Sequence, residues 1–312
     1  MATSAWGPDQ MLLSLTHETH YHYTPAVDNA DHMLRLKPTS SPVQTVLSHQ
    51  LDISPAPSQV RDMSDVYGNR CSFFSLESSH DRLCVTAHST VLTHALPAVL
   101  PACQVAWEQV REMFRYRAGV PYNTAWEFLF ASPYAPRDKA FAEFASPSFA
   151  PGVPLLDAAA QLMTRIHQTM TYDDDSTDVN TPALMALQQR KGVCQDFAHI
   201  MVACCRAMGL PARYVSGYML TQPTPGQPRL IGCDASHAWA SVYCPGNSNE
   251  AGQWFDFDPT NNRMPGDDYI TLATGRDFLD VSPLRGVIRG GAQHELRVAV
   301  TVMPLESMPC LV

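Results

Sequence analysis

The chain contains 312 residues, of which 45% are hydrophobic and 16% are charged, and its formal net charge is −9. Charged residues are scarcer than the usual ~25%, so the composition excludes a globally disordered chain, and the length predicts two domains of about 150 residues each. The negative charge, without any run of Lys and Arg, argues against nucleic acid and anionic membranes as partners, because both are bound through basic surfaces.

The N-terminal segment and the cysteines indicate the compartment. The first 20 residues lack the basic segment and the long apolar run of a signal peptide, and no stretch approaches the ~20 apolar residues of a membrane span. The chain has nine cysteines, an odd number without regular spacing. Such a set suits free thiols in a reducing compartment better than a secreted disulfide framework, so we expect a cytoplasmic protein.

Residues 12–93 form the first structural unit that the sequence predicts. Short segments rich in β-branched and aromatic residues alternate here with turn residues, as in LSLTHETHYHY, HMLRLKP and RLCVTAHSTVLTH. Several short strands of this kind are typical of an antiparallel β-sandwich or a small barrel. We therefore expect a β-rich N-terminal domain over residues 1–100.

Helical spacing replaces this alternation after Pro97. A Pro-rich stretch with short helices comes first, and the segment PLLDAAAQLMTRIHQTM then places Leu155, Leu162 and Ile166 on one helical face. We expect a helical, Pro-rich connection over residues 101–153 and the second domain over residues 154–312.

The second domain is predicted to contain a helix followed by antiparallel strands, which makes the fold class α+β. An apolar stripe begins at Val193 and ends at Gly209, a residue that favours the end of a helix. Three strand-like segments follow, ARYVSGYML, SHAWASVYC and QWFDFDPT, and HELRVAVTV predicts a last strand. The loops over 221–234 and 261–280 are expected to shape the substrate pocket.

Cys194 lies at the start of the predicted helix. Unpaired backbone N–H groups and the positive end of the helix dipole stabilise a thiolate in that position. The other cysteines of the chain lack this setting. Cys194 is therefore the candidate nucleophile, although most single cysteines are small core residues.

A histidine and an aspartate complete the set of residues that an activated thiol requires. His237 stands at the start of the strand SHAWASVYC, and Asp258 ends the strand QWFDFDPT. A base and an orienting carboxylate are the partners that activate a nucleophilic thiol. Asp256 lies on the same strand face as Asp258, so the alternation leaves open which aspartate contacts the histidine.

Three motifs resemble one known family. The segments RKGVCQDFAHIMVACCRAMGLPARYVSGY, DASHAWASVYCPG and WFDFDPTNN, in this order, resemble the bacterial transglutaminase-like cysteine peptidases of the papain-type superfamily. The segments YHYTPAV, HMLRLKP and DVYGN resemble the β-rich N-terminal domain that accompanies these cores, and GRDFLDVSPLRG resembles a segment after the core. The resemblance implies a papain-like core in which the helix that bears the nucleophile packs on an antiparallel sheet.

The resemblance also implies the catalytic residues. It makes Cys194 the nucleophile, His237 the base and Asp258, rather than Asp256, the orienting carboxylate. These residues imply an enzyme without cofactor or metal that attacks a peptide or protein amide and forms a thioester acyl-enzyme. We expect hydrolysis, because water is always present; transfer to an amine, as in a protein-glutamine transglutaminase, is the alternative.

Two further interpretations have weaker support. His17, His20 and His22 are close in sequence and Cys204 adjoins Cys205, but no CxxC or HExxH motif accompanies them, so a metal enzyme is disfavoured. The second interpretation is a noncatalytic module that binds a peptide. The intact set of Cys194, His237 and Asp258 argues against it, because such a module needs no catalytic residues.

Three residues near the motifs, Trp239, Tyr218 and Asp196, are expected to have structural rather than catalytic roles. Aromatic residues on strands are more often core residues than ligand contacts, so Trp239 and Tyr218 are expected in the core rather than beside an acyl groove. We expect a structural role for Asp196.

Overall fold

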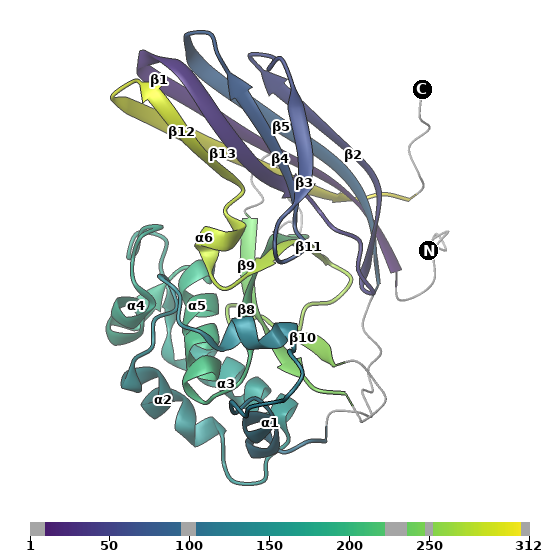
Figure 1. Cartoon of the computed structure of the whole chain (residues 1–312), viewed down its shortest axis with the longest axis vertical. Coiled ribbons are helices and arrows are strands. Elements are labelled where there is room, and N and C mark those ends of the chain that lie inside the picture. The colour runs from purple at the N-terminus through teal and green to yellow at the C-terminus, as the bar shows by residue number, and fades with distance from the viewer. Residues whose placement is uncertain (1–9, 95–103, 222–235, 247–251, 307–312) are drawn as a thin grey trace, which may run out of the picture.

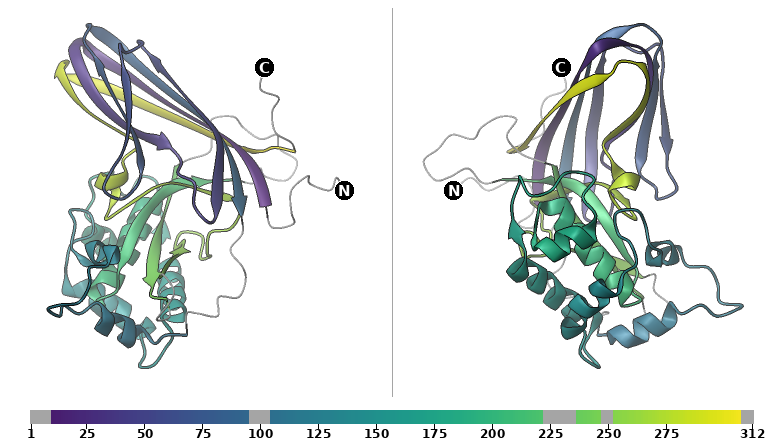
Figure 2. Two further views of the ribbon diagram at one scale, coloured as in Figure 1. Left: turned by 45° about the vertical axis from the view of Figure 1, so that its right-hand side comes forward. Right: turned by 90° about the vertical axis from the view of Figure 1, so that its left-hand side faces the viewer.

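The computed structural model describes residues 10–94, 104–221, 236–246 and 252–306. A curled antiparallel sheet forms one part of the molecule, and a smaller sheet with helices packed on it forms the other (Figure 1). Figure 2 shows how the curled sheet sits above the helices and the smaller sheet. This arrangement confirms the expected α+β class, with a β-rich domain ahead of a helix-on-sheet core.

Among the described residues the larger sheet has seven strands. They are β1 (Gln10–Lys37), β2 (Gln44–Ser54), β3 (Val60–Ser64), β4 (Arg70–Leu76), β5 (His80–His94), β12 (Leu284–Gly290) and β13 (Gln293–Pro304).

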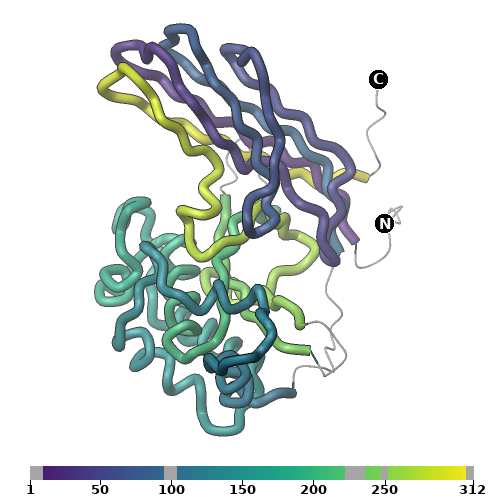
Figure 3. Tube along the Cα trace, viewed as in Figure 1, coloured from purple at the N-terminus to yellow at the C-terminus, as the bar shows by residue number. Residues whose placement is uncertain are grey.

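Strand β1 is the long strand that organises the larger sheet. Its first half pairs with β5 on one edge and with β13 on the other, and its second half pairs with β4 and β12. Figure 3 shows the yellow C-terminal strands beside the purple β1. The expected last strand is thus present as β13, but it pairs with β1 and lies in the N-terminal sheet, not in the second domain where we predicted it.

The core sheet has the strand order β10-β9-β8-β11, and all its neighbours are antiparallel. Its strands are β8 (Ala212–Met219), β9 (Ser236–Cys244), β10 (Gln253–Phe257) and β11 (Tyr269–Gly275). The first three are the strands expected from the sequence. Strand β11 was not expected, because we treated 261–280 as a loop.

Helices and one small strand pair make up the rest of the core. The helices are α1 (Trp107–Met113), α2 (Lys139–Ala145), α3 (Leu155–Thr169), α4 (Ala183–Gln189), α5 (Cys194–Ala207) and α6 (Phe278–Val281), with 3-10 turns η1 (Thr124–Leu129) and η2 (Ser146–Ser148). The pair is parallel and consists of β6 (Thr171–Tyr172) and β7 (Lys191–Gly192). The two helices predicted most clearly are present as α3 and α5.

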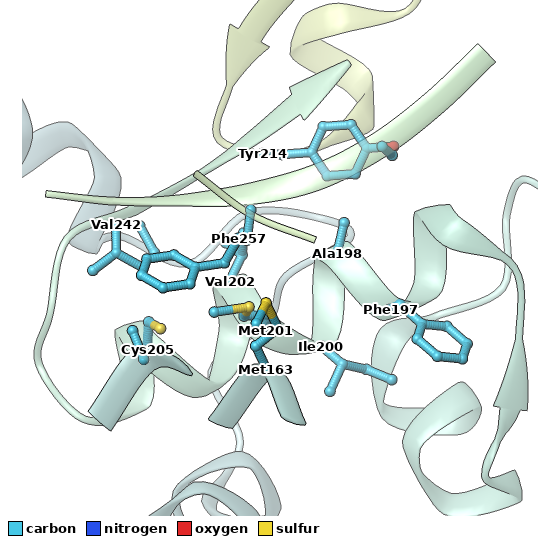
Figure 4. Packing of buried hydrophobic residues seen from close by; sticks show 14 of the residues in the cluster. Met163, Phe197, Ala198, Ile200, Met201, Val202, Cys205, Tyr214, Val242 and Phe257 are labelled. Carbon is cyan, nitrogen blue, oxygen red and sulfur yellow. The ribbon is translucent and has the colours of Figure 1, made fainter. Parts of the chain in front are cut away.

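Helix α5 is the buried helix of the core. Every residue from Asp196 to Arg206 is buried, and the helix packs against β8 and β9 as well as α2, α3 and α4. Figure 4 shows Met201 in the same buried cluster as Met163 of α3 and Phe257 of β10. Because burial of one such side chain contributes about 1.5–3 kcal/mol, this packing firmly fixes the position of Cys194 at the N-terminus of the helix.

Side-chain amides join the two parts of the molecule at β11, the edge strand of the core sheet. Gln44 Nε2 donates to the Thr271 carbonyl over 2.7 Å, and the Thr271 N–H donates back to Gln44 Oε1 over 2.8 Å. Asn69 forms the same pair of bonds with the backbone of Thr274, both 2.8 Å long. Two carboxamides thus satisfy backbone groups that an edge strand leaves unpaired.

The cysteines follow the expectation of free thiols only in part. Cys71, Cys84, Cys194, Cys204 and Cys205 are free, whereas Cys244 is disulfide-bonded. The expectation of free thiols is therefore wrong for Cys244. Within the described ranges, no helix has the length and apolar character needed to span a bilayer.

Gly217 on β8 provides a test of the packing behind the core sheet. A Cβ at this position would lie 2.1 Å from the Ile270 carbonyl oxygen and 2.5 Å from the Trp239 ring. We expect Gly217→Ala to lower the free energy of unfolding by about 1–3 kcal/mol, because this site has no room for a methyl group. Urea denaturation measures the change. In Gly266→Ala the new Cβ would lie 3.2 Å from a flexible Asp268 side chain, and a loss as large as that of Gly217→Ala would contradict the packing argument.

Candidate active site

Cys194 is the first residue of α5, and the residues around it form a tight cap. Asp196 Oδ2 accepts a hydrogen bond from the Val193 N–H over 2.9 Å and another from the Thr177 hydroxyl over 2.7 Å. A Cβ at position 192 would lie 2.5 Å from the same oxygen, so Gly192 leaves the room that the cap needs. Asp196 thus caps the helix, in keeping with the structural role expected for it, and Cys194 remains half-buried.

His237 and Asp258 are brought together by the pairing of β9 with β10. His237 is the second residue of β9, Asp258 directly follows β10, and His237 Nε2 donates to Asp258 Oδ2 over 2.7 Å. The Cys194 side chain also forms a hydrogen bond with the imidazole. Because Nε2 faces the carboxylate, Nδ1 is the ring nitrogen left to face the sulfur. The structure therefore places the three candidate residues in one series.

Asp256, the other aspartate on the same strand face, has a different partner. Its Oδ2 accepts a hydrogen bond from the indole N–H of Trp239 over 3.0 Å. The geometry therefore assigns the contact with His237 to Asp258, which the alternation of residues along β10 left open.

The Asp258 carboxylate is fully buried and accepts hydrogen bonds at both oxygens. Oδ2 accepts from Asn261 Nδ2 and from the Tyr269 hydroxyl, each over 2.7 Å, in addition to His237. Oδ1 accepts from the Thr260 N–H over 2.9 Å. Sequence reasoning missed Asn261 and Tyr269. The position of Asn261, three residues after Asp258, was a usable signal, whereas Tyr269 lies on the unexpected strand β11.

These contacts set the protonation of the pair. Burial by itself would lower the pKa of His237, but its hydrogen bonds with Asp258 and Cys194 and the charges of both outweigh burial and raise that pKa to about 10. Burial would likewise raise the pKa of Asp258, and the hydrogen bond and charge of His237, with Asn261 and Tyr269, lower it instead. At neutral pH the pair is therefore an imidazolium and a carboxylate.

Tyr172 is a neighbour of Cys194 that the sequence did not single out. It pairs with Gly192 across the strands β6 and β7, two residues before the nucleophile position. Burial, followed by the charge of Cys194 and contacts with Asp174, raises the pKa of Tyr172 to about 12. The Tyr172 phenol is therefore neutral at pH 7.

Trp239 and Tyr218 are both fully buried, so they occupy core positions rather than an open groove. Tyr218 contacts the N-terminal sheet, where its hydroxyl lies 2.9 Å from His17 Nδ1. The other ring nitrogen of His17 lies 3.1 Å from the Thr19 hydroxyl. In the part of the chain that the structure describes, no group of three His, Cys, Asp or Glu side chains is placed to hold a metal ion. The expected pocket loop 222–234 lies outside the described residues.

Comparison with known proteins identifies the family. Residues 13–92 match the bacterial transglutaminase-like N-terminal region, and residues 143–259 match the transglutaminase-like superfamily. An uncharacterized protein of Mycobacterium tuberculosis (strain ATCC 25618 / H37Rv) is 39% identical over 94% of this chain and 92% of its own length. An uncharacterized protein of Mycobacterium leprae (strain TN) is 30% identical over 94% of this chain and 99% of its own length. The chain belongs to the bacterial transglutaminase-like family.

A solved structure shows the same fold in another bacterial protein. The protein, from Cytophaga hutchinsonii, is described provisionally as a cysteine protease, and it superimposes with a TM-score of 0.71 at 21% identity. The superposition covers 96% of this chain and 92% of that one. The family resemblance that the sequence motifs carry is thereby confirmed, and the transglutaminase-like family is one of cysteine-based enzymes.

The raised pKa of His237 predicts how stability depends on pH. A histidine whose pKa rises from 6.5 to about 10 on folding contributes stability that is complete below pH 6.5 and lost as the pH approaches 10. We expect the difference in unfolding free energy between the wild type and Asp258→Asn to shrink from pH 6 to pH 9, by up to ~1.4 kcal/mol per pH unit. Urea denaturation at both pH values measures it. Asp256→Asn is the control, and a pH-independent difference for Asp258→Asn would refute the interpretation.

Proposed function

We propose that this protein hydrolyses peptide or carboxamide bonds, with Cys194 as nucleophile, His237 as acid and base, and Asp258 as the group that orients the imidazole. The observation that carries the proposal is the series of contacts from the half-buried sulfur to the imidazole and from the imidazole to a fully buried carboxylate. Such a series supplies every group that an activated thiol requires.

In the proposed reaction the Cys194 thiolate attacks the substrate carbonyl. The backbone N–H of Cys194, at the N-terminus of α5, stabilises the oxyanion that forms. The His237 imidazolium then gives its proton to the leaving amine, and a thioester remains on the sulfur. Neutral His237 takes a proton from water, the resulting hydroxide attacks the thioester, and the acid leaves as the thiolate is restored.

Hydrolysis and acyl transfer share the first half of this reaction and differ only in what attacks the thioester. Water needs no binding site of its own, which supports hydrolysis. The provisional description of the Cytophaga hutchinsonii protein as a cysteine protease points in the same direction. Transfer to a protein amine is the second candidate, because it needs no catalytic residue beyond those named.

Selective alkylation tests the nucleophile. Cys71, Cys204 and Cys205 are buried, and burial raises the pKa of each thiol. We therefore expect iodoacetamide at pH 7 to label Cys194 first, as located by mass spectrometry of the digested protein. Cys194→Ala should abolish both this rapid labelling and all turnover of peptide amides.

The control for this experiment is Cys84→Ala, which removes the other half-buried free thiol of the described residues. It should retain rapid labelling and turnover. If Cys194 reacts no faster than the buried thiols, the chain is a peptide-binding module rather than an enzyme.

The products separate hydrolysis from transfer. With a library of glutamine-containing peptides and peptide amides we expect the free acid and the released amine or ammonia as products. Addition of a primary amine at millimolar concentration should leave acid as the main product, as measured by mass spectrometry. An amine adduct as the main product would assign the protein to acyl transfer instead.

A further inference from the structure

A cavity of about 700 Å³ lies between the two parts of the molecule. The larger sheet contributes residues 39–43 and the turn 67–69, and the core sheet contributes side chains that include Val215, Trp239 and Trp254. This volume falls within the range of about 300–1,000 Å³ that small-molecule sites occupy. The cavity is separate from the proposed nucleophile, because Cys194 and His237 do not line it.

Arg213 lines this cavity, and the charge of Asp256 acts on it without a direct contact between the two side chains. Its Nε is buried and makes no hydrogen bond, and within the described residues the guanidinium forms no ion pair. The guanidinium carbon lies 4.3 Å from the centre of the Trp254 ring, which orients the plane of the group. A guanidinium with a buried donor that lacks an acceptor can bind a carboxylate through charge-assisted hydrogen bonds.

Arg206, a buried arginine on α5, shows what a structural guanidinium looks like in this protein. It donates to the carbonyl oxygens of Phe128, Ala212 and Arg276 and to the Ser132 hydroxyl. Burial lowers the pKa of both arginines to about 10. The fold therefore satisfies Arg206 completely with its own groups and leaves Arg213 open to the cavity.

Asp256 faces Arg213 across the floor of the cavity. Arg213 on β8 and Asp256 on β10 are both in register with Ser241 on β9, so their Cα atoms are about 10 Å apart at the usual strand spacing. No hydrogen bond or ion pair joins the two among the described residues, and the Ser241 hydroxyl between them is buried without a partner. A base, a hydroxyl and an acid thus form one polar row.

The apolar walls complete the description of the site. The half-buried rings of Trp254 and Tyr67 line the cavity beside the polar row, with Trp239, Val215 and Leu272 buried behind its surface. A guanidinium binds a carboxylate through two parallel hydrogen bonds, and the negative Asp256 disfavours a dianion such as phosphate at the same place. A ligand that carries one carboxylate, one ammonium and an apolar side chain matches all these groups.

We propose that the cavity binds a small zwitterion of the amino-acid class with an apolar side chain. Its carboxylate pairs with Arg213, its ammonium pairs with Asp256, and its side chain packs against the half-buried rings of Trp254 and Tyr67. The shared chemistry fits either a free amino acid or a short peptide. The inference does not depend on the proposed function, because binding at this site requires no reaction at Cys194.

Isothermal titration calorimetry on the Cys194→Ala protein tests the proposal without turnover. The ligands are L-phenylalanine and glycyl-L-phenylalanine, compared with 3-phenylpropionate, which lacks the amine, and phenethylamine, which lacks the carboxylate. We expect saturable binding of at least one zwitterion, and at least tenfold weaker binding of both truncated compounds. Whichever of the two zwitterions binds more tightly shows whether a free amino acid or a short peptide is the better ligand.

Variants assign the contacts. Arg213→Gln and Arg213→Lys should each weaken binding at least tenfold, since one removes the charge and the other removes the planar pair of donors. Asp256→Asn should weaken the binding of the zwitterion more than it weakens the binding of 3-phenylpropionate. Arg61→Gln, the same change at an exposed position on β3, should leave binding unchanged.

Thermal unfolding of the ligand-free variants shows whether Arg213 has a structural role instead. Arg213→Gln should unfold at nearly the same temperature as its parent, because no hydrogen bond or ion pair within the described residues holds this guanidinium. No saturable binding of either zwitterion, or binding that both Arg213 variants retain, would overturn the proposal.

Discussion

The burial of the Asp258 carboxylate is the constraint on which the rest of the site depends. A carboxylate without solvent contact must have its lone pairs filled, and hydrogen bonds to a charged group contribute about 1.5–3 kcal/mol each. The donors come from three places: His237 on β9, Asn261 in the turn after β10, and Tyr269 on β11. Satisfying one buried charge therefore requires the turn and both strands to be in their native positions at once.

The same requirement gives the N-terminal sheet a part in the site. Tyr269 begins β11, an edge strand whose backbone is held by the carboxamides of Gln44 and Asn69 from the larger sheet. The larger sheet in turn is organised around β1, which brings the C-terminal strands back beside the N-terminal ones. The position of β11 therefore depends on the sheet organised by β1, and the position of Tyr269 on β11 in turn supports the contact between Asp258 and His237.

The sequence predicts the local parts of this arrangement better than the long-range ones. The buried helix that begins at Cys194 and the strand that carries His237 have clear periodicity, and the structure has both where we expected them. Asp258 could not be separated from Asp256 by periodicity alone, because the choice depends on the partner that each aspartate meets across the strands. Tyr269 was missed for the same reason. The pairing of β13 with β1 joins residues that lie far apart in the sequence, from Leu13 with Pro304 to Thr24 with Gln293, and no local pattern encodes it.

Buried charge also explains why the two faces of the core sheet differ in character. The face that packs on α5 carries apolar residues such as Val242 and Phe257, which need no partner (Figure 4). Alternation places Trp239 and Asp256 on the opposite face, toward the larger sheet, together with other polar groups. There the indole of Trp239 pairs with Asp256, whereas the guanidinium of Arg213 remains unpaired in a cavity large enough for a ligand. A ligand that carries a carboxylate would supply the acceptor that the fold does not offer to this guanidinium.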